Sequence, residues 1–317
     1  MLEIREATTD EDLGHMVAII GRVSPDNPMS VEEARWQDAQ YPGGKRFVAW
    51  LDGVPVGCGG AGRVYMYAED FPALWGNLSV LPEYRGRGVG SALLVALGGV
   101  AQAAGKPELY GRTTSDRPDA VRFLERRGFR EVERMKVVRL ELAALAAGVV
   151  PPIDAPAGTT IVSRADRPDL ADRLYDVAVE ALPDIPGDGR MDPGTPEEFR
   201  VRDVDRAIMP AWGCAIAVDD ATSDVVGYSN LLLVAGTPGL AWNAMTAVRR
   251  AWRGRGIAAA LKRATIAWAI ANGLEAIETA NDVDNAPMRA VNHRLGYEPM
   301  PDEVYFRGPA VRAGVPA

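Results

Sequence analysis

The sequence predicts a mixed α/β fold made of two similar domains in tandem. Three observations support this prediction. The chain has 317 residues, about twice the size of a common domain. A glycine- and arginine-rich segment of the first half recurs in the second. In each half, strand-like segments dominate at first and then alternate with helix-like ones. We therefore expect a mixed, partly antiparallel sheet flanked by helices in each domain.

The recurring segment is the clearest feature of the chain. Leu78–Leu94 reads LSVLPEYRGRGVGSALL, and Met245–Lys262 reads MTAVRRAWRGRGIAAALK. One constant offset in residue number relates Val80 to Val248 and, further on, Gly128-Phe129 to Gly296-Tyr297. A frame that is shared over so long a stretch without an insertion indicates an internal duplication.

The composition changes between the two halves. Pro151-Pro152 and further proline and glycine residues follow an Ala/Leu-rich stretch. Paired prolines fix φ and remove backbone donors, so this run is typical of a semi-rigid linker. We place the first domain at residues 1–145, the linker at 146–158 and the second domain at 159–317.

The elements are expected in the same order in both halves. A strand leads into a helix at residues 4–13 and again at 161–170. Two strands joined by a tight turn follow, at Asp52-Gly53 in the first half and at an Asp-rich turn between residues 214–218 and 225–234 in the second.

The later elements surround the repeated loop. An apolar strand ends at Val80 or Val248, the Gly/Arg loop follows, and a helix comes next. The second such helix is expected over Ile257–Asn272, since its apolar residues have helical spacing and Gly273 is a helix stop. A strand, a helix and a strand that starts at a Gly-aromatic pair close each half.

Composition and charge exclude several classes of function. The chain is 47% hydrophobic and 25% charged, which is ordinary for a globular protein, and its net charge is −8. An excess of negative charge argues against a broad nucleic-acid or anionic-membrane surface. Two cysteines and two histidines exclude a disulfide framework and argue against a His- or Cys-based metal site.

The location of the protein is expected from two further features. The chain starts without a basic-then-apolar leader, and its longest strongly apolar run, residues 92–101, is too short to span a bilayer. With few thiols in addition, we expect a cytoplasmic protein with no membrane partner. The sequence leaves open whether it is a monomer or a homodimer.

Both repeated loops have the residues of a polyphosphate site. Arg85–Gly90 reads RGRGVG, Arg253–Ala258 reads RGRGIA, and each lies between an expected strand and helix. A helix start offers unpaired backbone N–H groups, glycines permit close approach, and arginines add charge-assisted hydrogen bonds. The alternative is a Gly-rich surface turn, which is less plausible for two copies in one register. A P-loop is excluded because its motif is absent.

A second glycine motif competes with this interpretation. Gly57–Gly62 reads GCGGAG and fits the G-x-G-x-x-G dinucleotide pattern after a strand. The residues that follow, Arg63–Tyr67, alternate like a strand rather than a helix, so a phosphate would lack its helix terminus. We therefore expect a bulged or kinked strand at Gly57–Gly62.

The two loops carry a family resemblance. A strand, then Arg-x-x-Gly-x-Gly/Ala, a helix, and a later Gly-Phe/Tyr strand resemble the GNAT superfamily of acyl-CoA-dependent N-acyltransferases, here in tandem. The resemblance implies acetyl-CoA as co-substrate and no metal. It also implies that the strand before the loop pairs with pantetheine and splays from its neighbouring strand to admit the thioester. The backbone amides of the loop are expected to bind the diphosphate. These cofactor-binding roles fall on Val80, Arg85, Arg87, Gly88, Val89, Gly90, Val248, Arg253, Arg255, Gly256, Ile257 and Ala258.

The resemblance favours the second half as the site of chemistry. In many members a later helix has an Asn that touches the cofactor and a Tyr that protonates the leaving thiolate. The second half keeps Asn285 but has Asn292 at the Tyr position, and an amide is no general acid near neutral pH. The first half has Arg117 and Leu124 at these positions and departs further. Asn292 is alternatively a helix-surface or packing residue.

The general base and the binding site of the amine that accepts the acetyl group are less evident. An ordered water is the expected base, with Tyr228 and Glu278 as alternatives. In GNAT-like proteins the loop between the first helices borders the acceptor site. Here that loop is acidic, and its Asp184 and Asp188 would attract a cationic amine, although a solvated loop is equally plausible. Asn281 either ends a strand or faces the acceptor.

The expected function is therefore transfer of an acetyl group from acetyl-CoA to the primary amine of a small molecule. Three alternatives stay open. The protein could bind or sense acyl-CoA without turnover, since both halves lack the tyrosine. It could acetylate a protein N-terminus or a lysine. It could use an aminoacyl-tRNA donor, which the net charge of −8 argues against.

Overall fold

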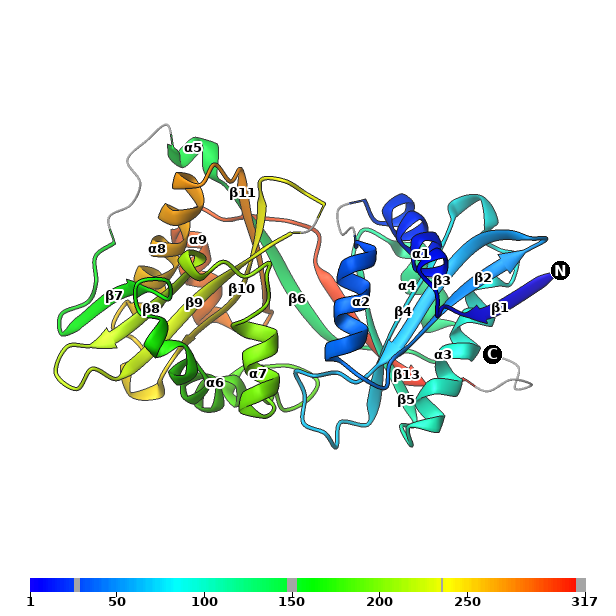
Figure 1. Ribbon diagram of the computed structural model, residues 1–317, viewed down its shortest axis with the longest axis horizontal. Coiled ribbons are helices and arrows are strands. Elements are labelled where there is room, and N and C mark those ends of the chain that lie inside the picture. The colour runs from blue at the N-terminus through cyan, green and yellow to red at the C-terminus, as the bar shows by residue number, and fades with distance from the viewer. Residues whose placement is uncertain (26–28, 147–152, 235, 312–317) are drawn as a thin grey trace.

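The computed structural model describes residues 1–25, 29–146, 153–234 and 236–311. Figure 1 shows two halves side by side, with strand β6 running between them. The first half contains β1 (Leu2–Glu6), α1 (Asp10–Val23), α2 (Val31–Gln40), β2 (Lys45–Leu51), β3 (Val54–Gly62), β4 (Ala73–Val80), the 3₁₀ turn η1 (Pro82–Tyr84), α3 (Val89–Ala103), β5 (Glu108–Thr114), α4 (Pro118–Glu125), β6 (Arg130–Glu141) and α5 (Leu142–Ala146).

The second half repeats this order. It contains β7 (Thr159–Ser163), η2 (Pro168–Arg173), α6 (Leu174–Ala181), η3 (Leu182–Asp184), α7 (Pro196–Asp203), η4 (Ala211–Gly213), β8 (Cys214–Asp219), β9 (Val225–Leu233), β10 (Leu240–Val248), η5 (Arg250–Trp252), α8 (Ile257–Ala271), β11 (Ala276–Asp282), α9 (Ala286–Arg294), β12 (Glu298–Pro299) and β13 (Glu303–Pro309). The predicted mixed α/β class with two repeated units is confirmed.

All strands belong to one sheet. Its order is β1-β2-β3-β4-β5-β13-β6-β11-β10-β9-β8-β7, and β12 pairs with β6 off this path. Within this sheet, β4 pairs with β5 and β10 with β11 in parallel, whereas the remaining pairs are antiparallel. The mixed, partly antiparallel sheet is therefore as predicted, but the sheets of the two halves are continuous.

The continuity arises because the halves exchange their last strands. Strand β13 of the second half lies between β5 and β6 of the first. The C-terminal part of β6, around Val138 and Arg139, lies in turn between β11 and β12 of the second half. A strand from the other half therefore pairs with β5 in the first half and with β11 in the second.

Helices cover both faces of the sheet in each half. In the first half, α1 and α2 bury Met16 and Ala34 against one face, and α3 buries Leu93 and Leu97 against the other. In the second half, α6 and α7 cover the first of these faces and α8 the second. The sheet of the second half therefore lies between α6 and α7 on one side and α8 on the other.

Several local predictions have clear outcomes. Asp52 and Gly53 have φ of 52° and 83° and connect β2 to β3, as the turn residues predict. Gly57–Gly62 lies within β3 rather than in a nucleotide-binding turn. The register of β3 against β2 shifts at Val56, just before this segment and not within it as predicted. The strand expected at Arg63–Tyr67 is wrong, because only Tyr67 is paired, in an isolated bridge to Met191.

Other predictions concern the linker and the cysteines. Residues 147–152 of the predicted linker lie outside the described residues. Cys58 and Cys214 are both buried free thiols. Across the part of the chain that the structure describes, no helix has the length and apolar character needed to cross a bilayer. The same described ranges contain no cluster of three or more His, Cys, Asp or Glu side chains arranged to hold a metal.

Candidate functional site

The two Gly/Arg loops have the same backbone conformation. Gly86 and Gly88 have φ of 76° and 83°, and Gly254 and Gly256 have φ of 74° and 89°, a left-handed region that favours glycine. Gly88 caps α3 and Gly256 caps α8, so the first N–H groups of both helices have no side-chain cap. Both loops thus retain the helix-start donors that an anion needs.

The loops are also open on their outer side. A methyl group built on Gly86, Gly88 or Gly254 would meet no atom within 4 Å. The arginine before each glycine pair is tied back to the preceding strand: Arg85 Nε donates to Val80 O at 3.2 Å, and Arg253 Nε to Val248 O at 3.0 Å. The two loops are therefore alike in backbone and in arginine anchoring.

The strand before each loop separates from its parallel neighbour. The pairing of β4 with β5 stops at Trp75–Tyr110, and that of β10 with β11 stops at Trp242–Glu278. Beyond these pairs, β4 remains paired only with β3, and β10 only with β9. Each half therefore has a strand edge with free backbone groups that leads directly to the Gly/Arg loop.

The second half differs from the first by a bulge in this strand. The register of β10 against β9 shifts between Asn243 and Met245, so Ala244 is an extra residue. The equivalent strand β4 pairs with β3 without a shift. A bulge redirects the side chains and backbone groups around it, and bulges are over-represented next to active sites.

Side-chain amides replace the ladder hydrogen bonds that the bulge interrupts. The Nδ2 of Asn243 donates to the carbonyl oxygens of Asn230 and Met245 at 2.9 and 3.2 Å, and to Ser229 Oγ at 3.0 Å. The Oδ1 of Asn230 accepts from Met245 N at 3.0 Å. The bulge is thus held in one conformation by a buried polar network.

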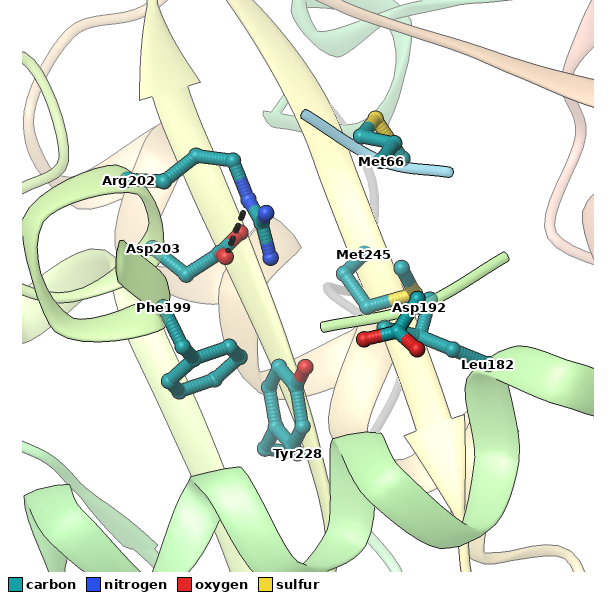
Figure 2. A pocket seen from close by; sticks show the side chains of 8 residues that line it. All are labelled: Met66, Leu182, Asp192, Phe199, Arg202, Asp203, Tyr228 and Met245. Atoms are coloured by element: carbon teal, nitrogen blue, oxygen red, sulfur yellow. Dashed lines mark hydrogen bonds and ion pairs between the residues drawn. The ribbon is translucent and has the colours of Figure 1, made fainter. Parts of the chain in front are cut away.

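A small cavity lies on the α6–α7 side of this bulge (Figure 2). Its volume of about 10 Å³ is enough for one water-sized group. Its lining residues come from β9, β10, α7, the loop before α7, η3 and the first half: Met66, Leu182, Asp192, Phe199, Arg202, Asp203, Tyr228 and Met245.

Two groups in this cavity have perturbed acidity. Burial raises the pKa of the Asp203 carboxyl above its ordinary value, and the Nε of Arg202 at 2.7 Å partly opposes this effect. Burial raises the pKa of Tyr228 well above its ordinary value, so its hydroxyl stays protonated at neutral pH. In Figure 2 this hydroxyl points into the cavity. The cavity therefore combines a carboxylate whose pKa is raised by burial with a hydroxyl donor.

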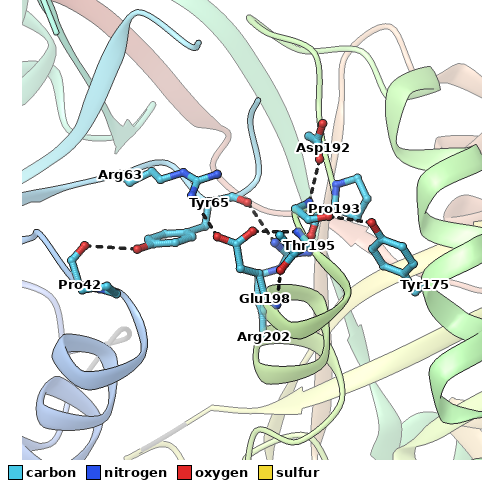
Figure 3. Close-up of polar contacts among 10 residues, drawn as sticks. Pro42, Arg63, Tyr65, Tyr175, Asp192, Pro193, Thr195, Glu198 and Arg202 are labelled. Atoms are coloured by element: carbon cyan, nitrogen blue, oxygen red, sulfur yellow. Dashed lines mark hydrogen bonds and ion pairs between the residues drawn. The ribbon is translucent and has the colours of Figure 1, made fainter. Parts of the chain in front are cut away.

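The first half closes one side of the cavity. Arg202 donates to the carbonyl oxygen of Tyr65 at 3.0 Å, and Asp192 N donates to that of Met66 at 3.0 Å. Arg63 pairs with Glu198 at 3.0 Å, as Figure 3 shows. The segment after β3 thus docks on α7 and on the loop before it, which explains why its alternating sequence forms no strand.

The residues predicted on α9 and β11 lie elsewhere. Asn285 caps α9 and accepts from Met288 N at 3.3 Å. Asn292 is buried, and its Nδ2 donates to Asn281 Oδ1 at 2.6 Å. Its own Oδ1 has no hydrogen-bond partner among the described residues. Asn292 is thus a buried residue and not a surface amide, and neither it nor Asn281 lines the cavity.

The two aspartates expected at the acceptor site do not reach the cavity. Asp184 binds Arg250 at 2.7 and 2.8 Å and Arg253 at 2.7 Å, so it lies at the second Gly/Arg loop. Asp188 pairs with Arg307 at 2.9 Å, on strand β13 beside the first half. Both carboxylates therefore already have arginine partners, and the aspartates that line the cavity are Asp192 and Asp203.

The base candidates have distinct surroundings. Glu278 pairs with Arg139 at 2.9 Å, and it lies on β11 rather than in the cavity. Tyr228 lines the cavity, but its raised pKa makes it a hydrogen-bond donor rather than a base. Sequence reasoning missed Asp203, which ends α7 in the run Arg-Val-Arg-Asp and carries no motif.

The arginines of the two loops differ in their partners. In the second half, Asp184 neutralises Arg253 and Arg250, and Glu180 Oε1 accepts from Arg250 N at 2.5 Å. In the first half, no carboxylate of the described chain forms an ion pair with Arg85 or Arg87. Asp184 thus offsets arginine charge at the second loop, whereas Arg85 and Arg87 have no such carboxylate partner among the described residues.

Comparisons with known proteins agree with this architecture. Residues 16–129 and 173–297 match the acetyltransferase (GNAT) family. The chain is similar to a solved tandem GNAT protein from the clavulanic acid biosynthesis pathway, with a TM-score of 0.76, 23% identity, and coverage of 99% of this chain and 100% of that one. It is also similar to a GCN5-related N-acetyltransferase from Sphaerobacter thermophilus, with a TM-score of 0.74, 22% identity, and coverage of 100% and 98%.

Proposed function

Because the chain belongs to the acetyltransferase (GNAT) family, whose members generally depend on acetyl-CoA, we propose that it transfers an acetyl group from acetyl-CoA to the primary amine of a small molecule. We place the chemistry in the second half. The observation that carries this choice is the bulge in β10, which joins the free edge of the strand on one side to a cavity with the partly buried carboxylate of Asp203 on the other.

The donor is proposed to dock along the free edge of β10. Its diphosphate would bind the backbone amides of Arg255–Ala258, with Arg253 and Arg255 adding charge-assisted hydrogen bonds. The pantetheine amides would pair with the backbone between Thr246 and Val248, which has no strand partner on that side among the described residues. This arrangement brings the thioester to the bulge.

The acceptor is proposed to lie on the opposite side of the bulge, with only its amino group, which is about the size of a water molecule, in the cavity. Its amine nitrogen attacks the thioester carbonyl carbon, a C–N bond forms, and the C–S bond breaks to release the thiolate of coenzyme A. Asp203 takes the proton that the amine loses, since its raised pKa brings it closer to neutral pH. Tyr228 donates a hydrogen bond within the cavity, and strand N–H groups stabilise the developing oxyanion.

The magnitudes are consistent with this assignment. Holding amine and thioester together can lower the barrier by about 7–11 kcal/mol, and a positioned base adds a factor of about 10²–10⁴. A thiol has a pKa near 8.5, so its thiolate is a tolerable leaving group without a general acid. The amide of Asn292 in place of a tyrosine is therefore compatible with turnover.

Release of free thiol from acetyl-CoA across a panel of polyamines, aminoglycosides and peptides with free amines tests this proposal. We expect release with at least one small-molecule amine. Arg253→Ala and Gly256→Pro should reduce it strongly, and the matched changes Arg85→Ala and Gly88→Pro in the first half should affect it less.

Three outcomes of this experiment would contradict the proposal. A stronger effect of the first-half changes would place the chemistry in that half. Tight binding of acetyl-CoA without release for any amine would identify a carrier-binding protein, as the missing tyrosines allow. Release with peptides alone would replace the small-molecule acceptor by a protein.

A further inference from the structure

Lys262 is a lysine that is buried in the interior of the second half. It lies on α8, only 1% of its surface is exposed, and it points beneath the bulge of β10. Its Nζ donates to Asn243 Oδ1 and lies 5.1 Å from the centroid of the Tyr297 ring. No carboxylate forms an ion pair with it within the described ranges. Burying an amine without a counter-charge is unfavourable.

The duplication provides an internal comparison for this site. The repeated frame places Leu94 of α3 where α8 has Lys262, and Phe129 where the second half has Tyr297. Gly76 follows the last parallel pair in the first half, as Asn243 does in the second. The same slot of the fold is thus apolar in the half without a bulge, so packing alone does not account for the lysine.

The surroundings favour the neutral form of the amine. Burial lowers the pKa of Lys262 to about 7. Burial also raises the pKa of Tyr297, so the ring that faces Nζ stays neutral. The other side chains that hydrogen-bond around Asn243 are uncharged: Ser229, Asn230, Thr246 and Thr279. The charged side chains of Arg202 and Asp203 lie on the cavity side of the bulge. A neutral amine still donates a hydrogen bond, which is what Asn243 Oδ1 receives.

We infer that Lys262 is a positioning residue for acyl transfer in the second half: through Asn243 it fixes the bulge of β10. This inference rests on the proposed function. The chain of contacts is short. Lys262 holds Oδ1 of Asn243, which orients Nδ2 toward the carbonyl oxygens of Asn230 and Met245 on either side of the bulge. Met245 in turn lines the cavity beside Tyr228 and Asp203.

Two substitutions separate the hydrogen bond from the volume of the side chain. Lys262→Met keeps the length and removes the donor, whereas Lys262→Gln keeps an N–H donor. Leu94→Met in the first half is the matched control for packing. We expect Lys262→Met to lower kcat by about 10–100-fold with an unchanged KM for acetyl-CoA, since a misplacement of about 1 Å has an effect of this size. Lys262→Gln should recover most of kcat, and Leu94→Met should leave it unchanged.

A double-mutant cycle tests whether Lys262 acts through Asn243. If it does, Asn243→Ala in the Lys262→Met background adds little further loss of kcat, because the contact is already broken. Independent, multiplicative losses would overturn the inference. A rise in KM with constant kcat would also overturn it, since the lysine would then serve donor binding.

A readout without turnover keeps this test separate from the proposed function. Hydrogen exchange of the Met245 and Thr246 amides, measured with coenzyme A alone, should accelerate in Lys262→Met and return toward wild type in Lys262→Gln. Unchanged exchange in Lys262→Met would refute the positioning role whatever the activity. Failure of the wild type to bind acetyl-CoA in calorimetry would refute the proposed function, while the exchange data would still report on the bulge.

Discussion

At the scale of single residues, Lys262 makes the stability of the protein depend on pH. The pKa of its amine is about 7 in the folded chain, below the value near 10.4 of an exposed lysine. Between these values the unfolded chain binds a proton that the folded chain does not. The free energy of unfolding therefore rises with pH across this window, by up to about 1.4 kcal/mol per pH unit from this residue, and is constant below it.

Lys262→Leu, which installs the residue found at Leu94 in the first half, should remove this dependence. Urea unfolding at several pH values from 7 to 10 measures it in both proteins. We expect the variant to be the more stable protein near pH 7, and the wild type to approach it as pH rises. Parallel curves for the two proteins would mean that the lysine is protonated in the folded state.

Asp203 is expected to set the acidic limb of the rate profile. Because burial raises the pKa of its carboxyl, kcat should fall as the pH drops through this raised value, when the base becomes protonated. Asp203→Asn should lower kcat by about 10²–10⁴-fold and abolish that limb. Asp205→Asn is the matched control, since Asp205 is exposed and pairs with Arg200 at 2.8 Å. A limb that persists in Asp203→Asn would assign it to another group.

These two residues differ in how visible they are in the sequence. Lys262 aligns with Leu94 when the two repeats are superimposed in sequence, so the sequence alone shows a basic residue on an apolar helix face. Asp203 has no such signal, because its burial depends on β9 and on the first-half segment with Met66. Similarly, the acidic loop could be recognised in the sequence. The ion pairs of Asp184 and Asp188 could not be predicted, because their arginine partners lie far along the chain, in η5, the second Gly/Arg loop and β13.

At the scale of elements, Asp184 at the end of η3 moderates the second Gly/Arg loop. It pairs with Arg250 and Arg253, and a diphosphate would have to compete for Arg253. Its side chain is 32% exposed, so each pair contributes only about 0.2–1 kcal/mol. Asp184→Asn should therefore raise the affinity of this loop for coenzyme A by about 2–5-fold.

Calorimetry with coenzyme A at low and high salt measures this effect, in an Arg85→Ala, Arg87→Ala background that weakens the first loop. Asp169→Asn is the control, since it removes the same charge from an exposed pair with Arg167 at 2.7 Å. Equal affinities for Asp184→Asn and its parent would show that the diphosphate does not use Arg253.

The elements were predictable where local chemistry decides them. Gly86, Gly88, Gly254 and Gly256 mark the loops because their positive φ excludes most other residues. The bulge in β10 was not predictable, because a single extra residue, Ala244, leaves the alternation of a short strand ambiguous and its register depends on β9.

At the scale of the whole molecule, the strand exchange could not be predicted from the duplicated sequence. A strand such as β13 has the same apolar pattern whichever half it joins, so the pattern identifies the strand but not its neighbours. The structure places Val304 and Phe306 of β13 in the core of the first half, with Leu109 and Phe129. The domain boundaries at 145 and 159 stay a prediction, since chain from each side completes the sheet of the other.

This exchange predicts that the two halves unfold together. Removing β13 from the first half would expose the edges of β5 and β6 and take Val304 and Phe306 from its core. Burial of such side chains stabilises a fold by about 1.5–3 kcal/mol each, against a typical total of about 5–15 kcal/mol for a domain. We therefore expect a single calorimetric transition for the intact chain, and no folded product from residues 1–146 or 153–317 expressed alone.

Cleaving the chain between the halves separates connectivity from strand exchange. A protease site placed at the exposed residues 153–155 allows the folded protein to be cut after purification. If the exchanged strands hold the halves together, the cut protein stays one species in gel filtration and unfolds in one transition, and the two fragments regain this state only when they are refolded together. Two independent transitions, or a first fragment that folds without β13, would show that each half completes its own sheet in solution.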